Sequence, residues 1–121
     1  MRMIAPALLA SSLLVGCSSV PPCDRPFIVE EVERLVRLHL ISHPEILRLP
    51  EVRSYAAYDE RTFKTEDIRD RGAQFNGRRC AALVLVSAPM AKFPDRLAVD
   101  YLIEPSAGGG VIVSMSARSA W

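Results

Sequence analysis

The chain is poor in the side chains that most catalytic and metal sites require. Its 121 residues include 2 histidines, 3 cysteines and 1 tryptophan, and 15 basic residues almost balance 14 acidic ones. A balanced charge without a basic stripe argues against a nucleic-acid partner. No apolar run reaches the roughly 20 residues that a membrane-spanning helix needs. We therefore expect one small domain, without a cofactor and without a metal.

The longest apolar stretch lies at the N-terminus and ends in a cysteine. It follows Arg2, carries no charge and is short enough for the apolar region of a secretory signal. Its last four residues, Leu14, Val15, Gly16 and Cys17, resemble the lipobox of bacterial lipoproteins, and all four positions fit. The alternative is a buried helix that happens to contain a cysteine, because the positive region before the run is sparse.

The lipobox resemblance implies a processed and anchored protein. Lipoproteins of this kind are cleaved before the cysteine, here between Gly16 and Cys17, and the Cys17 sulfur then carries a diacylglycerol. Several acyl chains together form a stable anchor, whereas one chain binds a membrane only marginally. Ser18, where an aspartate would favour the inner membrane, resembles the outer-membrane members. We expect a signal peptide over residues 1–16, a lipidated tether over 17–23 and a periplasmic domain over 24–121.

Two cysteines remain once Cys17 is assigned to the lipid. In an exported protein, an even pair predicts a disulfide, here between Cys23 and Cys80. Such a bridge closes a long loop and contributes about 4 kcal/mol in the chain-entropy model. The alternative is two free thiols, with Cys80 acting as a small buried apolar residue.

The first half of the domain reads as helix. Asp24 as N-cap and Pro26 in the first turn predict a start, and the helical period continues to about Ser42. The expected buried face consists of Ile28, Val32, Leu35, Val36 and His39, with Leu40 beside it.

Charged residues occupy the opposite side of this helix, where Glu30 and Arg34 have the i,i+4 spacing of an ion pair. The next four residues, "SHPE" at 42–45, resemble a capping box and predict a short second helix, which Pro50 ends or kinks. The following segment favours helix to about Tyr58.

The second half changes to the period of strands. Asn76-Gly77 between two extended runs predicts a hairpin turn, and residues 97–104 alternate between apolar and polar. Four strands with short connections predict an antiparallel sheet. The fold class is therefore α+β, with an N-terminal helix and a short second helix packed on a four-stranded antiparallel sheet. Residues 67–117 also resemble small exported α+β domains of unknown function, which implies a curved sheet and supports the disulfide.

Candidate chemistry is sparse. His39 and His43 have a spacing found in metal-binding helices, but no Cys or His elsewhere completes a ligand set, although Glu45 is near in sequence. The acidic pairs in expected loops could act as acid and base only within a cleft. They are Asp59, Glu60, Glu66 and Asp67.

Four aromatic residues could fill the core or form an interface: Tyr55, Tyr58, Phe63 and Trp121. Together these patterns favour a non-catalytic, membrane-anchored binding or assembly module that meets a protein partner in the cell envelope. The alternative is a small envelope enzyme, or an inhibitor of one, that uses the loop carboxylates.

Overall fold

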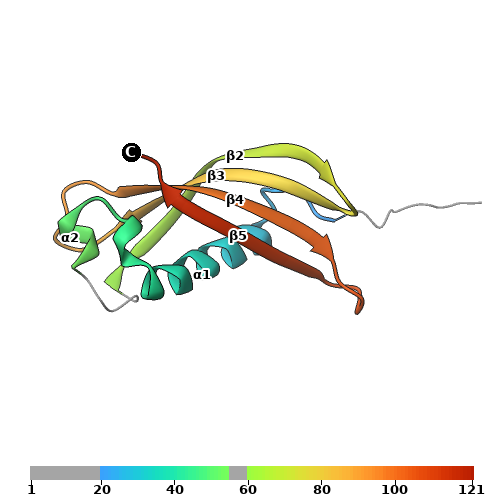
Figure 1. Ribbon diagram of the computed structural model, residues 1–121, viewed down its shortest axis with the longest axis horizontal. Coiled ribbons are helices and arrows are strands. Elements are labelled where there is room, and N and C mark those ends of the chain that lie inside the picture. Colours follow the sequence, from blue (N-terminus) through green and yellow to red (C-terminus); the bar gives the residue numbers. More distant parts are fainter. Residues whose placement is uncertain (1–19, 55–59) are drawn as a thin grey trace, which may run out of the picture.

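The computed structural model describes residues 20–54 and 60–121 and confirms the α+β fold class. A long helix crosses one face of a four-stranded sheet, and two short helical turns connect it to the first strand (Figure 1). In chain order the elements are α1 (Pro26–Ser42), the 3₁₀ turn η1 (Pro44–Ile46), α2 (Pro50–Arg53), β2 (Thr62–Gln74), β3 (Gly77–Ser87), β4 (Asp95–Pro105) and β5 (Val111–Ser119).

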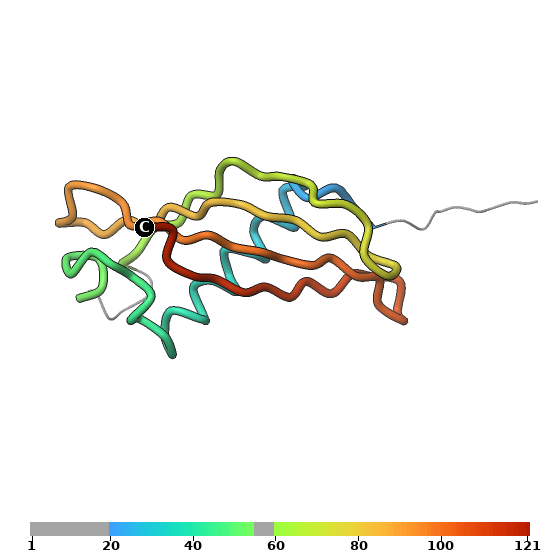
Figure 2. The backbone as a smooth tube through the Cα atoms, turned by 45° about the horizontal axis from the view of Figure 1, so that its top comes forward, coloured from blue at the N-terminus to red at the C-terminus, as the bar shows by residue number. Residues whose placement is uncertain are grey.

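The sheet is an antiparallel meander in the order β2-β3-β4-β5 (Figure 2). Every strand pairs with its neighbour in the chain, because the connections are too short for a crossover. The two central strands alternate between buried and more exposed residues along most of their length. One face therefore belongs to the core, and α1 lies against it.

The core forms where a diagonal stripe of α1 meets the inward face of β3 and β4. The stripe consists of Ile28, Val32, Val36 and Leu40, all at most 1% exposed. The prediction that Leu35 and His39 belong to this face is wrong, since both are only partly buried. Steps of four residues advance slightly more than one helical turn, so the stripe slants to Leu40 and leaves His39 half-buried. The facing strand residues are Cys80, Ala82, Val84, Val86, Leu97, Val99, Tyr101 and Ile103.

The other side of α1 carries an ion pair, though not the predicted one. Arg34 bonds Glu31, three residues earlier, with Nη2 2.6 Å from Oε2 and Nε 2.9 Å from Oε1. The expected partner was Glu30. The bidentate contact explains why Arg34 pairs with Glu31 instead of Glu30, since a guanidinium group can bond both carboxylate oxygens at once.

Prolines, rather than capping side chains, begin the three described helical segments. Pro26, Pro44 and Pro50 stand in their first turns, and no side chain caps any of them. The predictions of Asp24 as N-cap and of a capping box at 42–45 are therefore wrong, and Pro50 starts a helix instead of ending one. A proline suits the first turn because its missing N–H has no helical partner there.

The β2–β3 turn is displaced by one residue from the predicted Asn76-Gly77. Gln74 pairs with Gly77, so the two loop residues are Phe75 and Asn76, and Phe75 has a φ of 57°. Gly77 lies in the strand instead, where a Cβ atom would come within 2.2 Å of the Ile103 carbonyl oxygen. The glycine is needed for this close approach to β4, so a phenylalanine takes the left-handed turn position.

We expect the variant Phe75→Gly to raise the free energy of unfolding by about 0.5–1 kcal/mol. Relief of the left-handed backbone is worth about 1–2 kcal/mol, and the added entropy of glycine in the unfolded chain offsets part of it. Urea unfolding of the purified protein measures the change. Gly77→Ala is the matched variant and should lower stability, because its Cβ meets Ile103. A Phe75→Gly protein that is less stable than the native protein would contradict the claim that the backbone at Phe75 is strained.

Candidate binding surfaces

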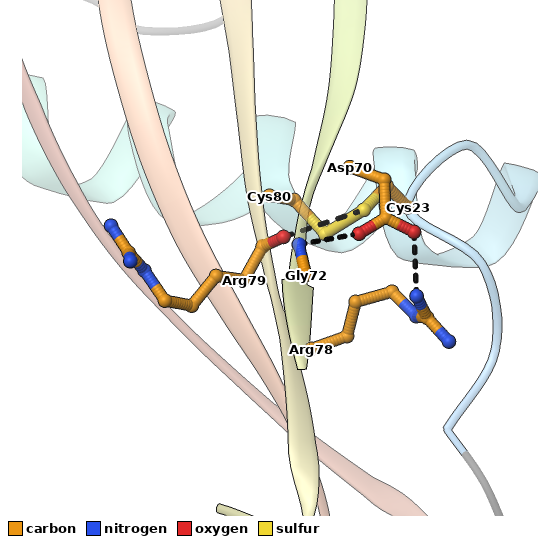
Figure 3. Close-up of polar contacts among 6 residues, drawn as sticks. All are labelled: Cys23, Asp70, Gly72, Arg78, Arg79 and Cys80. Atoms are coloured by element: carbon orange, nitrogen blue, oxygen red, sulfur yellow. Dashed lines mark hydrogen bonds and ion pairs between the residues drawn. A yellow bond between two sulfur atoms is a disulfide. The ribbon is translucent and has the colours of Figure 1, made fainter. Parts of the chain in front are cut away.

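The start of the described chain is fixed to the sheet through its cysteines. The Sγ atoms of Cys23 and Cys80 lie 2.11 Å apart and their Cα atoms 5.8 Å apart, which agrees with the predicted pairing (Figure 3). Both residues are buried. The bridge spans 57 positions, and loop closure on this scale is worth about 4 kcal/mol.

A buried tyrosine holds the same segment from the neighbouring strand. Tyr101 lies opposite Cys80 in the register, and its hydroxyl donates a 2.8 Å hydrogen bond to the Cys23 carbonyl oxygen. Burial raises the pKa of Tyr101 to about 12, and the Asp24 carboxylate adds to the effect. Val20 is also buried, so the expected tether joins the core three residues before Cys23.

Several predicted residues lie outside the described chain. They include the whole expected signal over residues 1–16, the cleavage pair Gly16 and Cys17, and three residues after α2: Tyr55, Tyr58 and Asp59. The helix that was expected to reach Tyr58 ends at Arg53 as α2. Glu60, the other acid of that pair, is described and exposed.

The prediction that Glu66 and Asp67 stand in a loop is wrong. Both lie within β2, where the pairing with β3 is interrupted by a register shift after Glu66, and Asp67 has a φ of 53°. Each has a basic partner on the same strand. Glu66 is 3.5 Å from Lys64, and Asp67 is 3.1 Å from Arg69.

These carboxylates share a shallow cleft with Asp24 and Asp70, beside the tether. The Gly72 N–H at 2.8 Å and then the Arg78 guanidinium at 2.5 Å hold the pKa of Asp70 below its ordinary value (Figure 3). Three of the four acids in this cleft, Glu66, Asp67 and Asp70, are thus each paired with a basic side chain.

The two histidines do come together. The ring centroids of His39 and His43 are 4.6 Å apart, and His43 Nδ1 lies 3.3 Å from a carboxylate oxygen of Glu45. Within the described ranges, no three His, Cys, Asp or Glu side chains are grouped closely enough to hold a metal ion.

The C-terminal tryptophan has a structural partner that the sequence did not suggest. Trp121 Nε1 donates to Asp95 at 2.6 Å, and the Arg96 guanidinium lies 4.6 Å from the ring centroid. Asp95 is fully buried and also accepts the Leu49 backbone N–H at 2.7 Å. The Asp95 carboxylate therefore joins the segment before α2 to Trp121. The sequence indicated only that Asp95 lies in a loop and suggested no role for it. Trp121 stays half exposed.

Phe63 is half-buried, and the Arg37 guanidinium covers its ring at 4.5 Å. Phe63 therefore contributes to packing and is not an exposed anchor.

Sequence reasoning also missed Arg61, which is buried at the start of the sheet. It donates through Nη2 to the Arg53 carbonyl oxygen at 3.2 Å, and burial lowers the pKa of its guanidinium.

Strand β5 presents an open edge. Two backbone hydrogen bonds extend the β4–β5 pairing by one residue at each end and keep its register: Ser106 N donates to Gly110 O, and Ala120 N donates to Arg96 O. Hydrogen-bonded pairs alternate in an antiparallel ladder, so the even-numbered residues of β5 bond β4. The odd-numbered residues direct their N–H and C=O groups away from the sheet: Val111, Val113, Met115, Ala117 and Ser119.

An apolar groove runs beside this edge, between α1 and the start of β5. It is lined by Phe27, Ile28, Glu31 and residues 111–113. A second hollow, lined by Val20, Pro21 and the β4–β5 turn, continues it through Phe27 and Val111. Phe27 and Ile112 are each more than half exposed.

The opposite edge, β2, is closed by its own sequence. Two register shifts bend the strand, and Asp70 engages the Gly72 N–H and the Arg78 side chain. Bulges and charges of this kind are devices that prevent strand pairing. The nine residues of β5 have no bulge, no proline and a single charge, Arg118, which pairs with Asp100.

Comparison of the chain with family models, curated proteins and solved structures gives no match. Within residues 20–54 and 60–121, no helix has the length and apolar character needed to cross a bilayer.

We expect the stability contributed by Tyr101 to be lost in strong alkali. Its folded pKa of about 12 exceeds the ordinary value of 10.0, so its share of stability is complete below pH 10 and disappears as the pH rises towards 12. Urea unfolding of the native protein and of Tyr101→Phe across this range measures the difference. The stability advantage of the native protein should shrink above pH 10. A difference independent of pH would contradict the assignment.

Proposed function

We propose that this protein is a lipid-anchored, non-catalytic binding module of the bacterial cell envelope. Cys17 carries the lipid, the domain faces the periplasm from the outer membrane, and β5 binds an extended segment of another envelope protein. The observation that carries the proposal is the contrast between the two sheet edges, one closed by bulges and charges and the other regular and open.

Strand addition suits β5 because its backbone and its groove serve different purposes. The outward N–H and C=O groups of the odd-numbered residues can bond any extended chain, which supplies affinity. The adjoining apolar groove, with Phe27 and Ile112 at its rim, can accept alternate side chains of that chain, which supplies specificity. Glu31 at the groove wall is bonded to Arg34, so the groove offers little net charge.

The anchor is supported by the lipobox and by the position of the tether. Val20 is buried and Cys23 is fixed to β3, so the chain from Cys17 enters the domain without a long linker. A non-catalytic role is supported by the cleft carboxylates, because Glu66, Asp67 and Asp70 all have basic partners.

Photo-crosslinking in the native host tests the function. A photoreactive residue replaces Ser116, which is exposed on β5, in the full lipidated chain. We expect an adduct of defined mass with a second, different envelope protein. The same probe at Arg69, exposed on the closed β2 edge, should give none.

A pair of substitutions at Ala117 assigns the contact to the backbone. Ala117→Pro removes an outward N–H without breaking a bond to β4, whereas Ala117→Val keeps that N–H. The Ser116 adduct should disappear in the proline variant and persist in the valine variant, with near-ultraviolet circular dichroism showing an intact fold for both. An adduct that survives Ala117→Pro, or that consists only of two copies of this chain, would refute the proposal.

A further inference from the structure

We propose that the end of the domain carrying the β2–β3 hairpin rests on the bilayer, with the Phe75 side chain inserted at the headgroup boundary and Arg71 and Arg79 against anionic lipids. The inference rests on the proposed lipidation of Cys17. It adds a second contact between protein and membrane, made by the folded domain itself.

The tether restricts which part of the domain can face the membrane. Only three residue steps separate Cys17 from the buried Val20, and a fully extended chain covers about 10 Å in that length. In both backbone views the chain enters the domain beside the β2–β3 hairpin (Figures 1 and 2). The Cys23–Cys80 bridge fixes this arrangement, since Cys80 follows Gly77 by three residues on β3.

The hairpin tip exposes an aromatic side chain at a strained position. Phe75 is 84% exposed, more than any other large apolar residue in the described chain, and its φ of 57° is costly for a bulky side chain. Packing within the domain does not require this residue, because its side chain projects into solvent. Strained backbone at an exposed position is a marker of functional sites.

Within the β2–β3 hairpin itself, basic residues outnumber acidic ones. Residues 70–79 include three arginines and one aspartate. Asp70 is paired with Arg78, which leaves Arg71 and Arg79 exposed on the two strands of the hairpin. Basic residues next to an apolar tip are the combination that binds anionic lipid headgroups.

The opposite end of the sheet provides a matched comparison. The β3–β4 loop exposes Phe93 by 70%, and Lys92 precedes it. Figure 1 shows that this loop and the C-terminus lie at the far end of the molecule from the tether. Phe75 and Phe93 are thus separated by the length of the sheet, and of these two the tether favours Phe75 as a membrane contact.

Fluorescence quenching in vesicles tests the inference. The full lipidated protein, as Phe75→Trp or Phe93→Trp, is reconstituted into vesicles of dibrominated phosphatidylglycerol and phosphatidylcholine. We expect the bromine atoms to quench the emission that the Phe75→Trp substitution adds and to shift it to shorter wavelength. The emission added by Phe93→Trp, and that of the native Trp121, should persist. Equal quenching in the two variants, or none in Phe75→Trp, would overturn the inference.

Charge variants test the role of the arginines. In the Phe75→Trp background, Arg71→Glu with Arg79→Glu should remove the extra quenching seen in phosphatidylglycerol vesicles relative to phosphatidylcholine alone. Quenching that does not depend on these residues or on the lipid charge would contradict the electrostatic part.

Mass spectrometry of the same sample separates the two proposals. A lipidated Cys17 without quenching in the Phe75→Trp variant would overturn the hairpin contact and leave the anchor standing. An unmodified Cys17 would overturn the anchor and with it this inference.

Discussion

The bridge between Cys23 and Cys80, reinforced by the Tyr101 hydroxyl, is the constraint on which the remaining arrangement depends. It fixes the chain to the two central strands immediately before Pro26 starts the long helix. The helix then crosses the sheet from a defined point. The same bridge brings Val20 into the core and determines which end of the sheet lies nearest the proposed lipid.

The two sheet edges acquire separate roles from this geometry. Strand β2 lies beside the tether and is closed by bulges and by the contacts of Asp70, whereas β5 is open and has an apolar groove beside its first residues. If the hairpin end rests on the membrane, β5 extends away from the bilayer and its edge is accessible along its whole length. A lipid anchor, an oriented domain and an accessible edge together would form a docking device suited to an envelope protein.

The periodicity of the sequence predicted the fold. The features that it did not predict depend on contacts between residues far apart in the chain. Alternation located β4, and the helical period located α1 with its end at Ser42. The hairpin was predicted, but the exact residues of its turn could not be, because Gly77 is needed against Ile103, a residue of another strand. The open edge of β5 was equally hidden, since which N–H groups face outward depends on the register with β4. The pairing of Cys23 with Cys80 could be predicted from the sequence, because the proposed lipid on Cys17 accounts for the third cysteine.

The central claim is that the three cysteines divide into one lipid site and one disulfide. Intact and peptide mass spectrometry of the protein extracted from its own membrane, without reduction, tests this most directly. The account predicts a chain that begins at Cys17, with lipid on that residue and Cys23 linked to Cys80. A disulfide that includes Cys17, or free thiols at both Cys23 and Cys80, would contradict it.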